Sequence, residues 1–200
     1  MFTQMLTAAF KELRTMTFVG LGLLGGLLTI AVWHDVRTYR IPNALVFSGT
    51  ALALVLHSVL PAGSGFVGSA PGGIGLLSAL GGLLVGLGAF MPLYLTRAAG
   101  AGDVKLMGMV GAFLGPVNAL GAAVATAVAG AVLAIVFTLK ARALRRMLSN
   151  MRLLLFAMFA RLSAEQGPTF DAQADTAARV PYSLAIAAGT VTWAFVMQLQ

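Results

Sequence analysis

Two aspartates, Asp35 and Asp103, are the residues of this chain whose positions predict chemistry. Both lie at the ends of long apolar segments, whereas the other four carboxylates lie in polar stretches. A carboxylate beside an apolar membrane segment is costly unless it is paired or used in function. Two carboxylates that face one pocket hold a single proton near neutral pH, because one pKa rises and the other falls. The ionised member can then activate water while the protonated member polarises a peptide carbonyl, which predicts aspartic-type peptide hydrolysis.

Ordinary ion pairs at the membrane surface are the alternative explanation for these two carboxylates. Asp35 could pair with Arg37 or Arg40, and Asp103 with Lys105. Residues two apart lie on different faces of a helix, which disfavours the Arg37 and Lys105 pairs. We expect Lys105 to extend toward lipid head groups instead. Charge placement alone leaves both explanations open.

Other kinds of site are disfavoured by the residue types present. The chain has no cysteine, so it offers neither a thiolate zinc site nor a cysteine nucleophile. No second histidine lies at ligand spacing from His34 or His57, which we therefore expect to be packing residues. The basic residues are scattered without interleaved aromatic ones, unlike a nucleic-acid surface. We expect no metal, no cofactor and no nucleic-acid partner.

The elements that must position the aspartates are membrane helices, because 59% of the residues are hydrophobic and only 10% are charged. We predict one all-α membrane domain over residues 1–200. A signal peptide is disfavoured for the first apolar run, because no small-residue cleavage site follows it. Pro42 suits the first turn of the second span, which begins at Asn43. About six transmembrane helices are predicted, over residues 15–33, 43–60, 74–96, 104–117, 118–139 and 181–199.

The fourth predicted span is short, since its 14 residues would rise only about 21 Å. Either the helix continues past Pro116, or a loop that carries Asp103 lies below the membrane surface, lining a water-filled pocket. Gly100 and Gly102 flank Asp103, and we expect them to permit an unusual backbone geometry and close approach of a substrate. Gly108, Gly111 and Gly115 are expected to form a face for tight helix packing.

Basic residues predict the orientation. Placing the connections 35–42, 97–105 and 140–179 on one side of the membrane gathers eleven of the thirteen basic residues there, which marks that side as cytoplasmic. Apolar residues at helical spacing between 144 and 162 predict an amphipathic helix on the cytoplasmic lipid leaflet within the loop 140–179. A calmodulin-type target is the alternative for that segment.

Three segments resemble the prepilin peptidases, which are GxGD aspartic peptidases of the type IV leader peptidase family. "GAGDVKL" (100–106) is similar to their GxGD-x-KL motif, and "DVRTYRIPNAL" (35–45) is similar to their D-x-R-x-x-x-IPN element. "PYSLAIAAG" (181–189) is similar to the opening of the last helix in the small peptidases of tight-adherence (Flp) pilus systems. Ser183 stands where that pattern has glycine, a change that we expect to affect local packing rather than chemistry.

The resemblance implies a bacterial inner-membrane endopeptidase that removes the leader from type IV prepilins or pseudopilins at the cytoplasmic face. Asp35 and Asp103 match the catalytic pair, with Gly100, Gly102 and Lys105 in one motif and Pro42 and Asn43 in the other. Larger members carry paired cysteines in an amino-terminal region and methylate their product. Only about 15 residues precede the first span here, so methylation is not expected. Two alternatives remain open: a small proton-coupled transporter, and a non-catalytic assembly protein of a secretion system.

Overall fold

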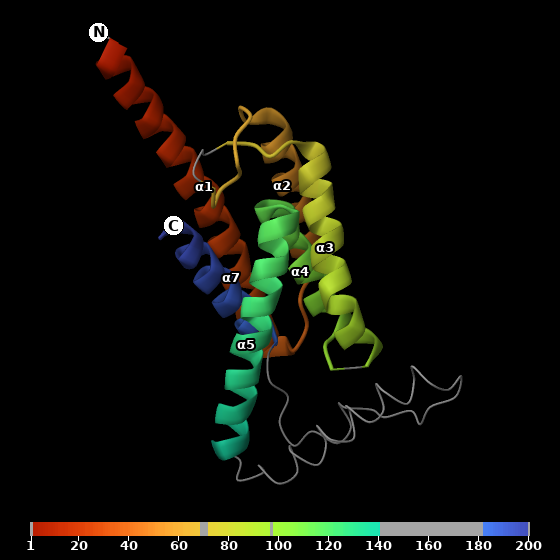
Figure 1. Cartoon of the computed structure of the whole chain (residues 1–200). Coiled ribbons are helices and arrows are strands. Elements are labelled where there is room, and N and C mark those ends of the chain that lie inside the picture. The colour runs from red at the N-terminus through yellow and green to blue at the C-terminus, as the bar shows by residue number, and fades with distance from the viewer. Residues whose placement is uncertain (1, 69–71, 97, 141–181, 200) are drawn as a thin grey trace, which may run out of the picture.

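A computed structural model describes residues 2–68, 72–96, 98–140 and 182–199. These residues form helices and contain no strand, which confirms the all-α prediction (Figure 1). The predicted amphipathic helix lies outside the described residues. The helices are α1 (Phe2–Thr38), α2 (Asn43–Val59), α3 (Leu76–Leu95), α4 (Ala101–Leu114), α5 (Pro116–Lys140) and α7 (Tyr182–Gln198).

Helix α1 is longer than the span 15–33 predicted from hydropathy. Charged residues ended the predicted span, but they are compatible with helical backbone hydrogen bonds, so α1 continues to Thr38. It stops where Tyr39 takes a positive φ of 51° and donates its backbone N–H to the Asp35 carbonyl. Ile41 precedes a proline and so is disfavoured in a helix. Asp35 therefore lies inside the last turn of α1.

Helix α4 is the centre of the bundle. Every residue from Leu106 to Leu114 is buried, and α4 packs against α1, α2, α3, α5 and α7. The helix does not continue past Pro116, because Gly115 takes a φ of 80° and α5 begins at Pro116. Asp103 is in the first turn of α4 rather than in a loop, which corrects both parts of the expectation for this segment. Protein, not lipid, surrounds this short helix.

Small residues allow α3 and α4 to approach closely. A Cβ atom on Gly82 would overlap the carbonyl oxygen of Gly111, and one on Gly111 would overlap that of Gly82. A Cβ on Gly86 would likewise overlap the Met107 carbonyl. Of the predicted glycine face of α4, Gly111 therefore makes a backbone-to-backbone contact with α3, whereas Gly108 faces the Leu87 side chain and Gly115 that of Ile74.

The end of the bundle away from Asp103 is closed by the segment after α2. Phe66 is buried there against His57, with ring centroids 4.7 Å apart. His57 Nε2 donates to the Phe113 carbonyl at 2.9 Å, while Nδ1 accepts the Ile74 N–H at 3.3 Å. His57 is thus a packing residue, as predicted.

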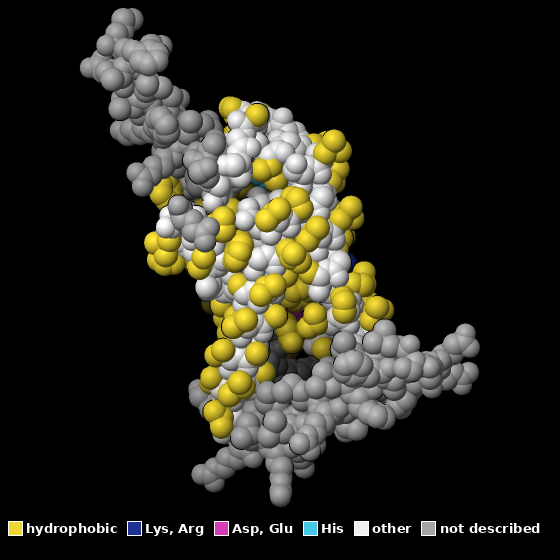
Figure 2. Space-filling view, viewed as in Figure 1, with side chains coloured by type: hydrophobic (Ala, Val, Ile, Leu, Met, Phe, Trp, Pro, Cys, Tyr) yellow, Lys and Arg dark blue, Asp and Glu magenta, His cyan; other side chains and the backbone are white. Residues whose placement is uncertain are grey.

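The outer surface is apolar. Among the described residues, three helical segments are long and apolar enough to cross a membrane: Phe18–Thr38, Leu76–Leu95 and Pro116–Val136. Large hydrophobic side chains are exposed on all of them, and Figure 2 shows such side chains spread over the described part of one face. An apolar surface of this extent would be costly in water. The protein is a membrane protein.

Candidate active site

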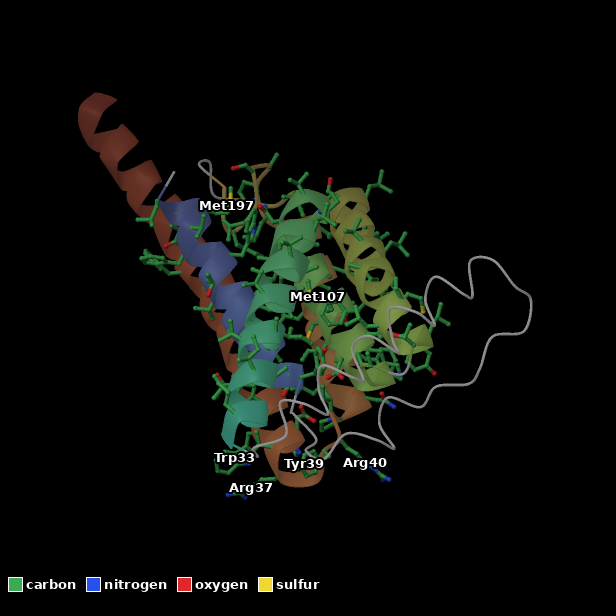
Figure 3. The ribbon with its side chains drawn as sticks, turned by 60° about the horizontal axis from the view of Figure 1, so that its bottom comes forward. Trp33, Arg37, Tyr39, Arg40, Met107 and Met197 are labelled. Atoms are coloured by element: carbon green, nitrogen blue, oxygen red, sulfur yellow. The ribbon has the colours of Figure 1, made fainter. Side chains whose placement is uncertain are left out.

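The ends of four helices meet at one end of the bundle, the lower end in Figure 1: the last turn of α1 and the first turns of α2, α4 and α7. Figure 3 shows Trp33, Arg37, Tyr39 and Arg40 together at this end, Met107 of α4 in the interior, and Met197 of α7 toward the other end. The candidate site residues Asp35, Asn43, Asp103 and Lys105 all lie in or next to these turns. The topology therefore brings both motifs together.

Asp35 points into the bundle, and only 8% of its surface is exposed. Its Oδ2 accepts a hydrogen bond from the Ser183 hydroxyl at 2.6 Å and a longer one from the Ser183 backbone N–H at 3.3 Å. Ser183 lies in the first turn of α7 and is fully buried. The expectation that the serine affects only local packing leaves out this contact, because Ser183 bonds directly to a candidate catalytic carboxylate.

Asp103 is the third residue of α4 and is 9% exposed. Its Oδ2 accepts the backbone N–H of Gly100, the residue that caps the helix, at 2.9 Å. Neither Gly100 nor Gly102 has a positive φ, so the expectation of an unusual backbone there is wrong. A Cβ at Gly100 would lie 3.4 Å from the Asp103 carboxylate, and one at Gly102 would lie 3.4 Å from Ile41, which are ordinary contact distances.

The two carboxylates, 68 residues apart in sequence, interact electrostatically. Asp103 precedes the apolar run of α4, and burial raises its pKa to about 6. The Gly100 hydrogen bond lowers this pKa and the negative charge of Asp35 raises it, but burial is the largest influence. Asp103 therefore binds a proton more readily than an exposed aspartate does, and it lies near a second carboxylate.

A second contact joins the two motifs. Lys105 Nζ donates to the Asn43 side-chain oxygen at 3.0 Å and lies 5.6 Å from the ring centre of Phe47. Lys105 therefore contacts the start of α2, which corrects the expectation that it extends toward lipid. Pro42 caps α2 just outside the helix instead of occupying its first turn.

Arg37 and Lys105 do not account for the two aspartates, because each has a different partner. Arg37 lies 3.8 Å from the ring centre of Trp33, and Lys105 bonds to Asn43 rather than to a carboxylate. The carboxylates instead bond to Ser183 and Gly100. In the part of the chain that the structure describes, no three metal-ligating side chains gather that could hold an ion.

A sequence model of the type IV leader peptidase family matches residues 22–135, more than half of the chain. The chain belongs to this family. The comparisons with characterised proteins and with solved structures give no match. Membership identifies a prepilin-type peptidase, a hydrolase whose substrates are prepilins. The matched residues of this peptidase include both Asp35 and Asp103 but end before α7, so Ser183 lies outside them.

Proposed function

We propose that this peptidase is an aspartic endopeptidase in which Asp35 and Asp103 are the catalytic pair. The observation that carries the proposal is the meeting of two buried carboxylates from α1 and α4 at one end of the bundle. Each keeps a small exposed fraction, 8% for Asp35 and 9% for Asp103. Water and a peptide carbonyl that approach this end of the bundle could therefore reach the carboxylates.

The pair would hydrolyse a peptide by proton transfers in which each carboxyl group handles one proton. The ionised carboxylate takes a proton from water as the water oxygen bonds to the scissile carbonyl carbon. The protonated carboxyl gives its proton to the carbonyl oxygen, which forms a neutral tetrahedral diol. When the carbon–nitrogen bond breaks, the first carboxyl returns its proton to the leaving nitrogen. The second carboxylate regains a proton from the diol hydroxyl, which restores the starting pair.

The basic residues indicate on which side of the membrane cleavage takes place. Arg37 and Arg40 lie at the end of the bundle that holds the aspartates, where Figure 3 shows them. By the positive-inside rule this end is cytoplasmic. We therefore place cleavage of prepilins or pseudopilins at the cytoplasmic face of the bacterial inner membrane. The segment 181–189 favours a substrate from a tight-adherence (Flp) pilus system.

Asparagine substitutions at the two positions test the proposal. Asp35→Asn and Asp103→Asn keep side-chain volume but remove an essential ionisable group, so each should reduce prepilin cleavage by at least about a thousandfold. The double variant should be little worse than either single one, because the two residues act as a unit. Conversion of prepilin to pilin is followed by gel shift in membranes with equal amounts of enzyme.

Asp171→Asn and Asp175→Asn are the matched controls, since both residues lie outside the predicted spans, and they should cleave normally. Normal cleavage by Asp35→Asn or Asp103→Asn would refute the catalytic pair. It would also return the transporter and assembly-protein alternatives to consideration.

We further propose that the peptidase cleaves without methylating its product. The chain holds none of the paired cysteines that the resemblance associates with methylating members. Purified peptidase given prepilin and S-adenosylmethionine should therefore yield pilin with an unmodified amino terminus. Mass spectrometry measures this directly, and a methyl group whose addition depends on this protein would contradict the proposal.

A further inference from the structure

Ser183 makes a contact that distinguishes the two aspartates. Its hydroxyl and its backbone N–H both bond to Oδ2 of Asp35, at 2.6 and 3.3 Å, and its side chain has no exposed surface. Asp103 receives one described hydrogen bond, from the backbone N–H of Gly100. The two carboxylates of the pair therefore have unequal surroundings.

The geometry indicates which protonation state of Asp35 is favoured. A backbone N–H can only donate, so the oxygen facing it must accept. A hydroxyl at 2.6 Å from a carboxylate oxygen has the short distance typical of donation to a charged acceptor. Donors directed at a carboxylate stabilise its ionised form, and they do so most effectively where water is excluded.

We propose that Ser183 is a positioning residue that holds Asp35 ionised and thereby leaves the shared proton on Asp103. The inference rests on the proposed function and assigns the roles within it. Asp35 takes the proton from water while the water oxygen bonds to the peptide carbon. Asp103 gives its proton to the carbonyl oxygen.

The other charged groups near Asp35 do not supply this asymmetry. On α4, Asp103 opposes ionisation of Asp35, and Lys105 is bonded to Asn43. On α7 the neighbouring titratable group is Tyr182, which interacts with Asp103. On α1 itself, Arg37 lies over the Trp33 ring, and His34 directly precedes Asp35 in the sequence. On α2, the titratable group is His57, which is bonded to Phe113 and Ile74 at the opposite end.

The test is the pH dependence of kcat/KM for prepilin cleavage in wild type and in variants of Ser183. Ser183→Ala and Ser183→Gly lose the hydroxyl but keep the backbone N–H, so the ionised form of Asp35 loses the shorter of its two hydrogen bonds from Ser183. The acidic limb of the profile should move to higher pH by about one unit, which is the size expected for a hydrogen bond to a charged group. At a pH on that limb, kcat/KM should fall about tenfold, with a smaller change on the plateau. Ser183→Thr keeps the hydroxyl and should restore the wild-type limb.

Thr190→Ala is the matched control. Thr190 is a buried hydroxyl on the same helix, seven residues further along, and its oxygen has no hydrogen-bond partner among the described residues. Its removal should leave the acidic limb unchanged, because no hydrogen bond among the described residues joins Thr190 to either aspartate.

Two results would overturn the inference. One is a uniform loss of kcat/KM at all pH values in Ser183→Ala or Ser183→Gly, which would indicate packing alone. The other is an unchanged acidic limb in whichever of these variants folds. Wild type that does not cleave at any pH would instead refute the proposed function, so the two failures are distinguishable.

Discussion

The protonation of Asp103 couples catalysis to stability. Burial raises its pKa from 3.8 to about 6, although the Gly100 N–H and the amino-terminal end of α4 both favour the charged form. A carboxyl group whose pKa is raised on folding stabilises the fold fully below the pKa of the unfolded chain. That contribution is lost as pH rises through the folded pKa. The stability of the peptidase should therefore fall between about pH 4 and pH 6 because of Asp103.

Asp103→Asn should remove this part of the pH dependence. The variant has no proton to lose, so its melting temperature should exceed that of wild type by a margin that widens from pH 4 to above pH 6. A shift of about two pKa units corresponds to roughly 3 kcal/mol, which is several degrees for a chain of this size. Thermal unfolding in one detergent across this range measures the margin. A margin that stays constant with pH would contradict the assignment of a raised pKa to Asp103.

The residues of the candidate site differ in how well the sequence predicts them. Asp35 and Asp103 stand out because charge is rare in this chain, and Lys105 and Asn43 because they belong to recognisable motifs. Ser183 could not be found in this way, since it is 148 residues from Asp35 and serine is common in membrane helices. The pattern at 181–189 did mark Ser183 as unusual, but only tertiary structure shows what it contacts.

At the scale of helices, the contact between α3 and α4 positions Asp103. Gly82→Ala places a Cβ against the Gly111 carbonyl, which backbone atoms cannot avoid by a rotamer change. We expect about 1–3 kcal/mol of destabilisation from overpacking, measured as a lower melting temperature in detergent. Cleavage should fall too, because a displaced α4 carries Asp103 away from Asp35.

Gly88→Ala is the control within the same helix. A Cβ on Gly88 meets nothing within 4 Å, so this variant should melt and cleave like wild type. Equal melting temperatures for Gly82→Ala and Gly88→Ala would show that the close approach of α3 and α4 does not contribute to stability.

Hydropathy predicted where the helices occur, but it did not predict whether lipid or protein surrounds each one. The break between α4 and α5 was visible in "GPVN", because glycine and proline interrupt helices. The full burial of α4 was not visible in the sequence, because an apolar helix has the same composition whether lipid or protein surrounds it. For the same reason the length of α1 was underestimated: hydropathy reports where charge begins, whereas a helix ends where its backbone hydrogen bonds end.

At the scale of the molecule, the two ends of the bundle differ in character. The end with the aspartates carries Arg37, Arg40 and Lys105, and the Trp33 ring beside Arg37 suits a membrane–water interface. The other end is formed by the segment after α2, with Phe66 and Val67 buried and no charged residue between Pro61 and Gly73. The positive charge at the first end is the kind expected on the cytoplasmic side.

Single cysteines test this orientation, because the chain has none of its own. Ala62 and Arg40 are both exposed and flank the two ends of α2, whose 17 residues span about 26 Å. In intact inner-membrane spheroplasts, an impermeant thiol reagent should label Ala62→Cys at once, and Arg40→Cys only after the membrane is opened. Ala62→Cys should also cleave prepilin normally, which verifies that the labelled protein is folded. Labelling of both positions from outside would mean that α2 does not cross the membrane. Labelling of Arg40→Cys alone would mean that the orientation is inverted, which would place the aspartates on the wrong side of the membrane for cleaving a cytoplasmic leader.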